Sequence, residues 1–600
     1  MLLITFAVKF ASMLALFCAT FAVASLLATA TPTTPIPLFA STLEPFYVVA
    51  PRSDPLNTSN FQIIQGGVAP SKIVLASGRV NYSRAELGWD YLQVDAPAVA
   101  GLPAWVPYLA GGYFEGVLTA AISGFPTHDE DPRPKHEKLG DSECHQRWMA
   151  DHFVYLHENM NKQHASPLDQ RFWGQMKNLW MQMEGIAKGI SWFRSYNVST
   201  VDVYMRSFTA AGAVNRFCAI NGTKRRAPPV VNPFAPTHCS AMVRPTADDL
   251  FVAHDTWTGF DYGMAVRIYK VYRFGGTEVA FSGYPVSIES GDDWYYVRQG
   301  QARLGVMETT NDVFNGSLFA ASGPRGVSEF ARVMIANYLA TDGASWVELF
   351  SKENIGDYCN QWMVTSFHKF TPGRALQPGT LWVAEQLPGL VESADVTDVL
   401  QRQGYWASYN IPYFPRVYNL SGYAAQEAEQ GSFWSHDQYA RAAIFKRNHS
   451  DVVDTASMQR MMRYNNWHAD PLSLIPNCTG ATGGVCSPRH SSMLTIASRG
   501  DLLPVYATAA ENVAHYGPIY GLVAQGCFGA TDSKIARWSQ PMVGLVVNGP
   551  SNDQVPTFNW GGSCEGHKPS QQGTPAVFDF PWLEIHPGEY VPPPTTSKRL

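Results

Sequence analysis

The hydrophobic pattern of the chain changes from helical to strand-like at Cys239, and this change limits the folds that the chain can adopt. Before it, apolar side chains recur at helical spacing through residues 141–196, as they do between Trp148 and Met160. Residues 221–238 then combine prolines with a basic cluster, which cannot continue a helix and should form an exposed linker. From Cys239 onward the pattern is typical of strands. Helices before this point and strands after it indicate an α+β fold of layered sheets with helical cover.

The part of the chain after Cys239 predicts a series of β-strands. Residues 239–244 and 250–254 are separated by a turn and should form a hairpin. No repeat period and no heptad pattern competes with this interpretation. Further strands are expected at 279–282, 294–297, 304–310, 363–367 and 381–386, and one helix at 328–351.

Composition indicates a globular protein and excludes one class of partner. Hydrophobic residues make up 46% of the 600 residues and charged residues 16%, which is enough apolar material for a large core. The formal net charge is only -6 and no basic stripe is present, so nucleic acid is not an expected partner. The length alone leaves the number of domains open.

The first thirty residues read as a targeting segment. Lys9 is followed by an apolar run from about residue 10 to 27 and then by Ala28-Thr-Ala30, which is the order of a cleaved secretory signal at 1–30. The run is nearly long enough to span a bilayer, so an uncleaved anchor is the alternative. Residues 31–238 and 239–600 would then form the mature protein, and no later segment has the apolar length of a transmembrane helix.

Sequons and cysteines fit the secretory route. If Cys239 is catalytic, seven other mature cysteines remain, so at least one of them stays unpaired. Cys478 and Cys486 are the best local candidates for a disulfide, because a short loop separates them. Asn-x-Ser/Thr sequons, which predict glycosylation, occur at Asn57, Asn81, Asn197, Asn221, Asn315, Asn419, Asn448 and Asn477.

Familiar catalytic motifs elsewhere in the chain give weak signals. Gly140-Asp-Ser-Glu143 precedes a helical segment instead of following a strand, which argues against a lipase-type serine. The sequence has no Gly-x-Ser-x-Gly and no His-Glu-x-x-His. The acidic run at 127–132 is more typical of a solvated loop than of a metal site. No metal and no cofactor is therefore expected.

Cys239 differs from these motifs, because it follows a disposable linker and begins a strand. A thiol in this place could attack the carbonyl carbon of its own preceding residue and cut the chain. The new α-amino group, with an ordinary pKa near 8, could then accept the thiol's proton, so that one residue supplies nucleophile and base. On composition alone, a buried structural cysteine is the favoured alternative.

Several segments around and beyond Cys239 resemble the phospholipase B-like proteins, a branch of the N-terminal nucleophile hydrolases. The likeness begins with Thr237-His-Cys-Ser-Ala241 and Asp249-Leu-Phe-Val-Ala-His-Asp-Thr-Trp257. It runs in order from about residue 80 to the C-terminus. The other matching segments are Gly112–Gly116, Phe281–Pro285, Met307–Thr310, Asp342–Trp346, Asn360–Met363, Gly404–Pro412, Arg441–Phe445, Met462–Trp467 and Asp470–Ser473.

The resemblance implies a four-layer αββα sandwich, formed by two associated chains that come from one precursor. Cys239 would be the nucleophile of an acyl hydrolase, and Asn410 the oxyanion-hole side chain. Arg441 would be the cation near the thiol. His254 and Trp257 would line the pocket, and Thr310 would lie next to the scissile carbonyl.

The implied substrate is an acyl lipid or an N-acyl small molecule, met through at most transient contact with a membrane surface. The implied location is the lysosome or the cell exterior, and the oligomeric state stays open. Because one fold hosts many activities, a lysosomal glycoprotein with a binding role and little turnover is the second hypothesis. Asp255 departs from an Asn found in many relatives and would raise the pKa of the thiol if its side chain pointed inward.

Overall fold

The structure is a computed structural model, and several predicted features lie outside the residues that it describes. These are the signal at 1–30, the acidic run at 127–132, most of the linker (222–237), and the pair Cys478 and Cys486. The described residues are 36–123, 143–194, 196–208, 210–221, 238–264, 266–475, 488–506, 508–516, 523–524, 526–569 and 574–588.

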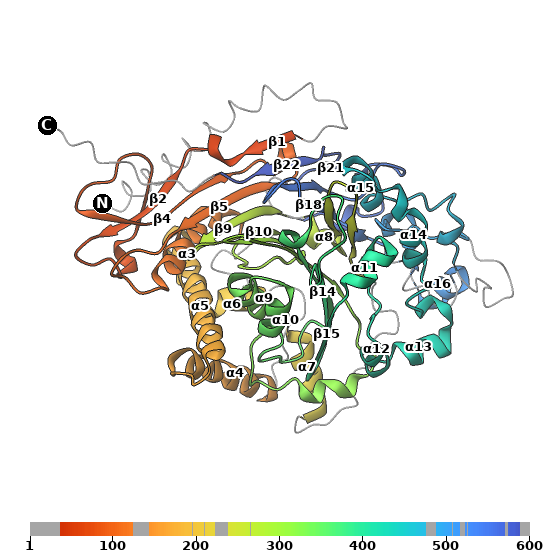
Figure 1. Ribbon diagram of the computed structural model, residues 1–600, viewed down its shortest axis with the longest axis horizontal. Helices are drawn as coiled ribbons and strands as arrows, with labels where there is room; N and C mark the ends of the chain where they lie inside the picture. The colour runs from red at the N-terminus through yellow and green to blue at the C-terminus, as the bar shows by residue number, and fades with distance from the viewer. Residues whose placement is uncertain are drawn as a thin grey trace.

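Two large β-sheets form the centre of the molecule (Figure 1). Within the described residues, one sheet has eleven strands and the other seven. The eleven-stranded sheet runs in the order β15 Leu390–Asp395, β14 Leu381–Leu387, β13 Asn360–Ser366, β12 Ala302–Thr310, β11 Trp294–Gln299, β10 Thr277–Gly283, β9 Ile268–Phe274, β5 Asp90–Ala96, β4 Lys72–Asn81, β2 Phe46–Pro51 and β3 Gln62–Ile64. The seven-stranded sheet runs in the order β1 Ile36–Phe39, β22 Leu583–His586, β19 Gly544–Asn548, β18 Asp532–Arg537, β7 Leu250–Asp255, β6 Ser240–Pro245 and β16 Trp406–Ser408.

The two sheets pack face to face, and helices cover their outer faces. Apolar side chains of the seven-stranded sheet, such as Val243 and Val252, share one buried cluster with Val271 and Met307 of the eleven-stranded sheet. A second cluster joins the other face of the larger sheet to α3, α5, α9 and α10, and a third joins the smaller sheet to α14 and α15. The larger helices are α3 Val106–Thr119, α4 Glu143–Asn161, α5 Pro167–Arg194, α6 Thr200–Ser207, α7 Ala211–Asn221, α9 Glu329–Leu339, α10 Gly343–Phe350, α11 Thr397–Gln403, α12 Pro415–Ser421, α13 Tyr423–Gln430, α14 Ala440–Asn448, α15 Thr455–Met462 and α16 Ala509–Tyr516.

The expected mixture of helices and strands is confirmed, but the segment before Cys239 is not only helical. It also supplies β1 to β5, and β5 pairs in parallel with β9, in a register that sets Asp90 beside Ile268. The larger sheet is therefore built from both sides of the linker. The strands expected after Cys239 are all present, including the antiparallel hairpin of β6 and β7.

The single helix expected at 328–351 is wrong, because the structure has two helices there. The α9 helix ends at Leu339, and the next residue, Ala340, adopts an extended backbone with ψ of 146°. Asp342 then caps α10, since its side chain accepts from the backbone N–H of Ser345 and completes a capping box. The apolar pattern continues across the break and hides it from an analysis of periodicity alone.

Two disulfides are present in the described residues. Cys144–Cys218 joins α4 to α7, and Cys527–Cys564 joins two segments near the C-terminus. Cys359 is a buried free thiol, which confirms that at least one cysteine besides Cys239 stays unpaired.

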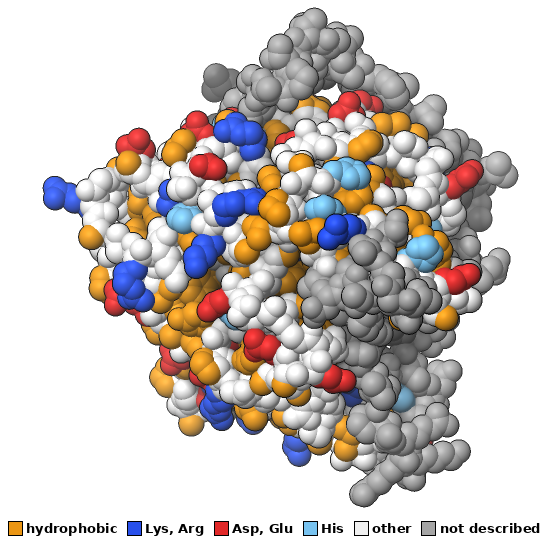
Figure 2. All heavy atoms as spheres, turned by 90° about the vertical axis from the view of Figure 1, so that its right-hand side faces the viewer, with side chains coloured by type: hydrophobic (Ala, Val, Ile, Leu, Met, Phe, Trp, Pro, Cys, Tyr) orange, Lys and Arg blue, Asp and Glu red, His pale blue; other side chains and the backbone are white. Residues whose placement is uncertain are grey.

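The described helices and one face of the surface can be compared with the expectations for membrane spans and for charge. Of the described helices, none has the length and apolar character needed to cross a bilayer. On the face drawn in Figure 2, Lys and Arg side chains are interspersed with Asp and Glu side chains and do not form a continuous stripe.

Candidate active site around Cys239

The register of the smaller sheet brings three strand ends to Cys239. Cys239 immediately precedes β6, whose neighbours β7 and β16 both run antiparallel to it. The end of β7 lies beside the start of β6, and the chain then turns into the short strand β8 (Trp257–Gly259). The end of β16 pairs with Ala241, which places Asn410 two residues farther on, next to the nucleophile candidate.

Arg441, in the first turn of α14, holds the backbone on both sides of the His238–Cys239 peptide bond. Its Nη1 donates to the carbonyl oxygen of His238 at 3.0 Å and to that of Cys239 at 2.5 Å. The guanidinium is fully buried and stacks over the Trp257 ring, 4.2 Å from its centroid. These contacts hold the Arg441 cation against the His238–Cys239 peptide bond, which the sequence predicts to be the site of cleavage.

Asn410 connects Arg441 to the larger sheet. Its side-chain oxygen accepts from Arg441 Nη2 at 2.5 Å, and its Nδ2 donates to the backbone oxygen of Thr310 at 2.7 Å. Asn410 adopts a φ of 71°, a left-handed conformation that Asn tolerates better than most residues. One N–H of the Asn410 amide is therefore used by the backbone oxygen of Thr310, at the end of β12.

The thiol of Cys239 is buried and protonated in this structure. Only 3% of the residue is exposed. Burial raises the pKa of Cys239 to about 12, and the negative charge of Asp293 adds to this effect, whereas the backbone N–H of Trp257 and the charge of Lys534 oppose it. The thiol consequently needs a base before it can act as a nucleophile.

His254 lies on β7 as a buried neutral imidazole. Burial lowers its pKa well below the ordinary value, and the charge of Lys534 acts in the same direction. Its Nε2 lies 2.8 Å from the backbone oxygen of Glu308, which fits an Nε2–H donor. Its Nδ1 has no hydrogen-bond partner among the described residues. His254 thus bridges the two sheets behind the thiol.

Asp255 does not act on the thiol as the sequence analysis allowed. It pairs across with Ser240, and neighbouring side chains on a strand alternate between faces. Its carboxyl therefore lies on the opposite face of the sheet from His254. Burial raises the pKa of Asp255 well above the ordinary value, which disfavours its charged form.

A buried pair of carboxyl groups near Cys239 was not found from the sequence. The Tyr358 hydroxyl donates to Asp293 Oδ2 at 2.7 Å and also contacts Glu308 Oε1 at 3.3 Å. The hydroxyl of Thr310 donates to the same Tyr358 oxygen at 3.2 Å. Glu308 stands inside the matched segment Met307–Thr310, but nothing in the sequence places Asp293 or Tyr358 beside it.

The six predicted site residues are thus brought into one connected group. Arg441 contacts Cys239, Trp257 and Asn410, and Asn410 contacts Thr310. His254 joins the group through the backbone of Glu308, whose side chain reaches Tyr358.

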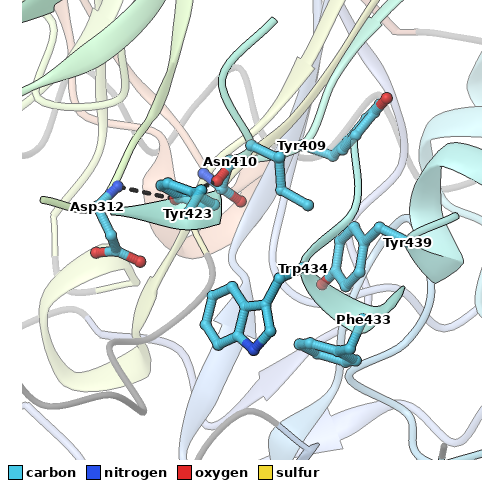
Figure 3. Close-up of a pocket in the computed structure, with 8 residues that line it drawn as sticks. Asp312, Tyr409, Asn410, Tyr423, Phe433, Trp434 and Tyr439 are labelled. Carbon is cyan, nitrogen blue, oxygen red and sulfur yellow. Dashed lines mark hydrogen bonds between the residues drawn. The ribbon is translucent and has the colours of Figure 1, made fainter. Parts of the chain in front are cut away.

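A small aromatic recess opens beside Asn410 (Figure 3). Tyr423 forms part of its wall, and its hydroxyl donates to the backbone oxygen of Asn410 at 2.6 Å and accepts from the backbone N–H of Asp312. The free interior has room for about one water molecule at most. The other lining residues are Tyr409, Ile411, Phe433, Trp434 and Tyr439, and the last three lie next to one another in Figure 3.

Fold and site together define a mixed α+β protein with a candidate cysteine nucleophile at the head of strand β6. The chain belongs to the phospholipase B family, because the family model described as Phospholipase B matches residues 76–585.

Curated relatives agree with this assignment. Phospholipase B-like protein A of Dictyostelium discoideum is 30% identical over 539 residues, covering 83% of this chain and 86% of the relative. Phospholipase-B 81 of Drysdalia coronoides is 29% identical over 540 residues, covering 85% and 88%. Phospholipase B-like protein G of Dictyostelium discoideum is 37% identical over 371 residues, covering 58% of this chain and only 56% of that relative's length.

Proposed function

We propose that this protein is an acyl hydrolase of the N-terminal nucleophile type, which cuts itself before Cys239 and then uses that residue as nucleophile. The mature form would consist of residues 31–238 and 239–600 in one αββα body. Pairing of β5 with β9 and of β1 with β22 supports lasting association of the two fragments, since both pairs join segments from opposite sides of the cut.

The observation that carries the proposal is the clamp of Arg441 on the carbonyl oxygens of His238 and Cys239. When Sγ attacks the His238 carbonyl carbon, negative charge develops on an oxygen that already accepts from Arg441 Nη1 at 3.0 Å. A donor fixed at a developing oxyanion typically accelerates such a step by about 100-fold or more. Cleavage would therefore require no large rearrangement of this side chain.

In turnover the same sulfur would attack the acyl carbonyl of a substrate. The freed α-amino group of Cys239 would accept the thiol's proton and pass it to the departing alcohol or amine. Asn410 would donate to the oxyanion after its Nδ2 exchanges the Thr310 oxygen for the substrate. Water would then hydrolyse the thioester, returning the thiol and releasing the acid.

The names of the relatives support an acyl ester of a phospholipid as substrate, with an N-acyl amide as the chemical neighbour to be tested. The aromatic recess beside Asn410 is an apolar surface next to the proposed oxyanion hole. The leader, the sequons and the disulfides support a secretory or lysosomal location.

The test compares wild type with Cys239→Ala and Cys239→Ser, each expressed as the full chain in secretory cells. N-terminal sequencing should find a fragment that starts at Cys239 in wild type and none in Cys239→Ala. Purified wild type should release fatty acid from defined phospholipids or N-acyl amides, and Cys239→Ala should lose at least about 1000-fold of this activity. An active wild type with residues 238 and 239 still joined would refute the proposal.

A binding glycoprotein with little turnover is the second candidate function. The narrowness of the recess and the slight exposure of Cys239 favour it, because neither leaves room for an acyl chain in the uncut form. A cysteine-reactive acyl probe separates the two candidates. Labelling of Cys239 in the cut protein supports the hydrolase, whereas a cut protein that resists the probe supports the binding role.

A further inference from the structure

Self-cleavage poses a chemical problem that turnover does not have. Before the cut, the nitrogen of Cys239 is part of a peptide bond and cannot accept a proton. The buried thiol is protonated, so another group must act as the first base. The inference that follows rests on the proposed function and names this group.

The nearby imidazoles are poor candidates. His254 donates its Nε2–H to the backbone of Glu308, and burial keeps its pKa well below the ordinary value. Burial also lowers the pKa of His238 to about 4, although its ring interacts with the backbone of Trp257. Both rings are therefore weak bases at any pH where the thiol could react.

Asp293 is the carboxylate whose charge acts most strongly on the Cys239 thiol. Its carboxylate belongs to a cluster of contacts around Cys239, in which Asp293 accepts from Tyr358 and Tyr358 accepts from the Thr310 hydroxyl. The separate backbone oxygen of Thr310 accepts from Asn410, which contacts Arg441 beside the carbonyl oxygen of Cys239.

Backbone strain marks the same group of residues. The structure describes six residues other than glycine with positive φ, and three of them are Asp293, Tyr358 and Asn410, at 54°, 44° and 71°. Such conformations persist only where surrounding contacts enforce them, and they cluster at functional sites. The contacts around these three residues must therefore stabilise them enough to offset the cost of their backbone conformations.

The carboxyl pair is also left without a cation. Neither Asp293 nor Glu308 forms an ion pair with any described residue, and Glu308 Oε2 is buried with no hydrogen-bond partner. Burial raises the pKa of Asp293 to about 6 and that of Glu308 well above its ordinary value. The charge of Asp293 helps to raise the pKa of Glu308, whereas the side-chain contact with Glu308 lowers that of Asp293, so the negative charge of the pair is favoured on Asp293.

We propose that Asp293, held by Tyr358 and Glu308, accepts the proton of the Cys239 thiol during self-cleavage and returns it to the departing nitrogen. The thiolate attacks the His238 carbonyl carbon, forming the S–C bond and an oxyanion opposite Arg441. The C–N bond then breaks, the Cys239 nitrogen takes the proton from Asp293, and a thioester remains. Water hydrolyses the thioester to the His238 carboxylate and the free thiol.

Several other groups set the charge of Asp293 and must be held constant. Asp292 and Lys534 act on it, in addition to Glu308 and Tyr358. The groups that feel its charge in return are Glu289, Glu329, Tyr262 and Tyr295. None of these is changed in the variants below, apart from Tyr358 itself.

The test follows cleavage of the full chain, made by cell-free translation with microsomes and then transferred to buffers between pH 4.5 and 8. For wild type, the rate should rise tenfold per pH unit up to about 6 and then level, because only the ionised carboxylate accepts a proton. Asp293→Asn should cleave at least about 100-fold more slowly and lose this inflection. Asp293→Glu should restore most of the rate and keep the inflection.

Asp90→Asn is the matched control, since Asp90 is equally buried, with a pKa raised by burial to about 6, but belongs to an ion pair with Arg84 far along the sheet. It should cleave at the wild-type rate. An Asp293→Asn chain with the wild-type rate and inflection would overturn the inference. A wild-type chain that stays uncut at every pH would instead refute the proposed function.

Tyr358→Phe keeps the inference testable if Asp293→Asn does not fold. The hydroxyl of Tyr358 lowers the pKa of Asp293 by donating to it, so its removal should move the inflection to higher pH. A residue with only a structural role would change the rate without moving the inflection. An unmoved inflection in Tyr358→Phe would therefore count against Asp293 as the base.

Discussion

Asp292 and Asp293 are neighbours in the chain, yet they belong to two buried regions built on opposite principles. Asp292 lies in an ion-pair cluster, where Arg267 Nη1 donates to it at 2.6 Å and the Tyr284 hydroxyl donates at 2.7 Å. Asp293 lies in the carboxyl pair with Glu308, where Tyr358 supplies the contact and no cation does. In the first region a cation contacts each carboxylate, although burial still raises the pKa of Asp292. In the second, the Asp293 carboxylate accepts from the Tyr358 hydroxyl, and its charge raises the pKa of the Cys239 thiol.

The ion-pair cluster shows what a buried charge needs in order to stabilise a fold. Arg267 also contacts Asp532, and Lys534 donates to Asp532 at 2.7 Å. Burial opposes ionisation of Asp532, but the charges of Arg267 and Lys534 outweigh it and hold the pKa of Asp532 below its ordinary value. Two cations thus match two carboxylates, which is how buried charges are normally tolerated.

The carboxyl pair, by contrast, destabilises the fold, because its negative charge is buried without a contacting cation. Its charge is retained although burial disfavours it, and such perturbed groups cluster where chemistry occurs. The difference teaches that burial of charge is not by itself a sign of function in this protein. A buried carboxylate that contacts no cation and acts on a candidate nucleophile is a better sign of function.

The largest expected effect comes from breaking the matched region. Arg267→Met removes one cation and leaves Asp292 and Asp532 buried around Lys534 alone. We expect a loss of about 3–5 kcal/mol in the free energy of unfolding, the usual result of removing one partner from a buried pair. Denaturant unfolding of the full chain at pH 7 measures it.

Arg298→Met serves as the control for that measurement. Arg298 also pairs with a carboxylate, Glu278, but its side chain is 47% exposed. Its loss should cost at most about 1 kcal/mol. Equal effects of the two substitutions would show that the matching of charges in the buried cluster contributes nothing special.

Much of the fold could be predicted from the sequence, and the failures have physical reasons. The hairpin of β6 and β7 was found because alternation and a turn are local signals. The break between α9 and α10 was missed because Asp342 and Ser345 form their capping box inside a continuous apolar pattern. The strands before Cys239 were missed because their partners, such as β9 for β5, lie far away in the sequence.

The six candidate site residues came from motifs, and the structure brings them together. The sequence could not reveal Asp293 and Tyr358, because their approach depends on the packing of β11, β12 and the turn before β13. It could not decide the face of Asp255 either, which is set by its pairing with Ser240. Periodicity identifies elements, whereas the meeting of loops at strand ends depends on tertiary contacts.

Neutralising Asp293 should have an effect of intermediate size on the free energy of unfolding, and of opposite sign, because it should stabilise the protein. Because its pKa is raised, Asp293 keeps a proton in the folded chain over a pH range where the unfolded chain has lost it. Stability should therefore fall as pH rises from about 4 to 6, by up to about 3 kcal/mol, and level above 6. Asp293→Asn removes this loss, so it should stabilise the protein at pH 7 and change little at pH 4.

Both proteins in that comparison carry Cys239→Ala, so that neither is cut. Thermal or denaturant unfolding at several pH values gives the difference in free energy. Arg267→Met in the same background should destabilise at both pH 4 and pH 7, provided that Asp532 stays ionised, as its lowered pKa predicts. A difference between Asp293→Asn and its parent that does not grow with pH would contradict an ionised Asp293.

The smallest effect is expected from Glu308→Gln at pH 4, and its growth with pH tests which member of the pair carries the charge. Burial and the neighbouring charge of Asp293 raise the pKa of Glu308 well above its ordinary value, so the folded chain keeps this proton over a pH range where the unfolded chain has lost it. Glu308→Gln exchanges one neutral donor for another of nearly equal size and should change stability by less than about 1 kcal/mol at pH 4, where Glu308 is largely protonated in both states. Above about pH 5 the variant should gain stability over its parent, and the gain should continue to grow above about pH 6. A gain that levels near pH 6 would place the negative charge on Glu308, the residue whose backbone oxygen His254 contacts, and the comparison between Asp292 and Asp293 would lose its basis.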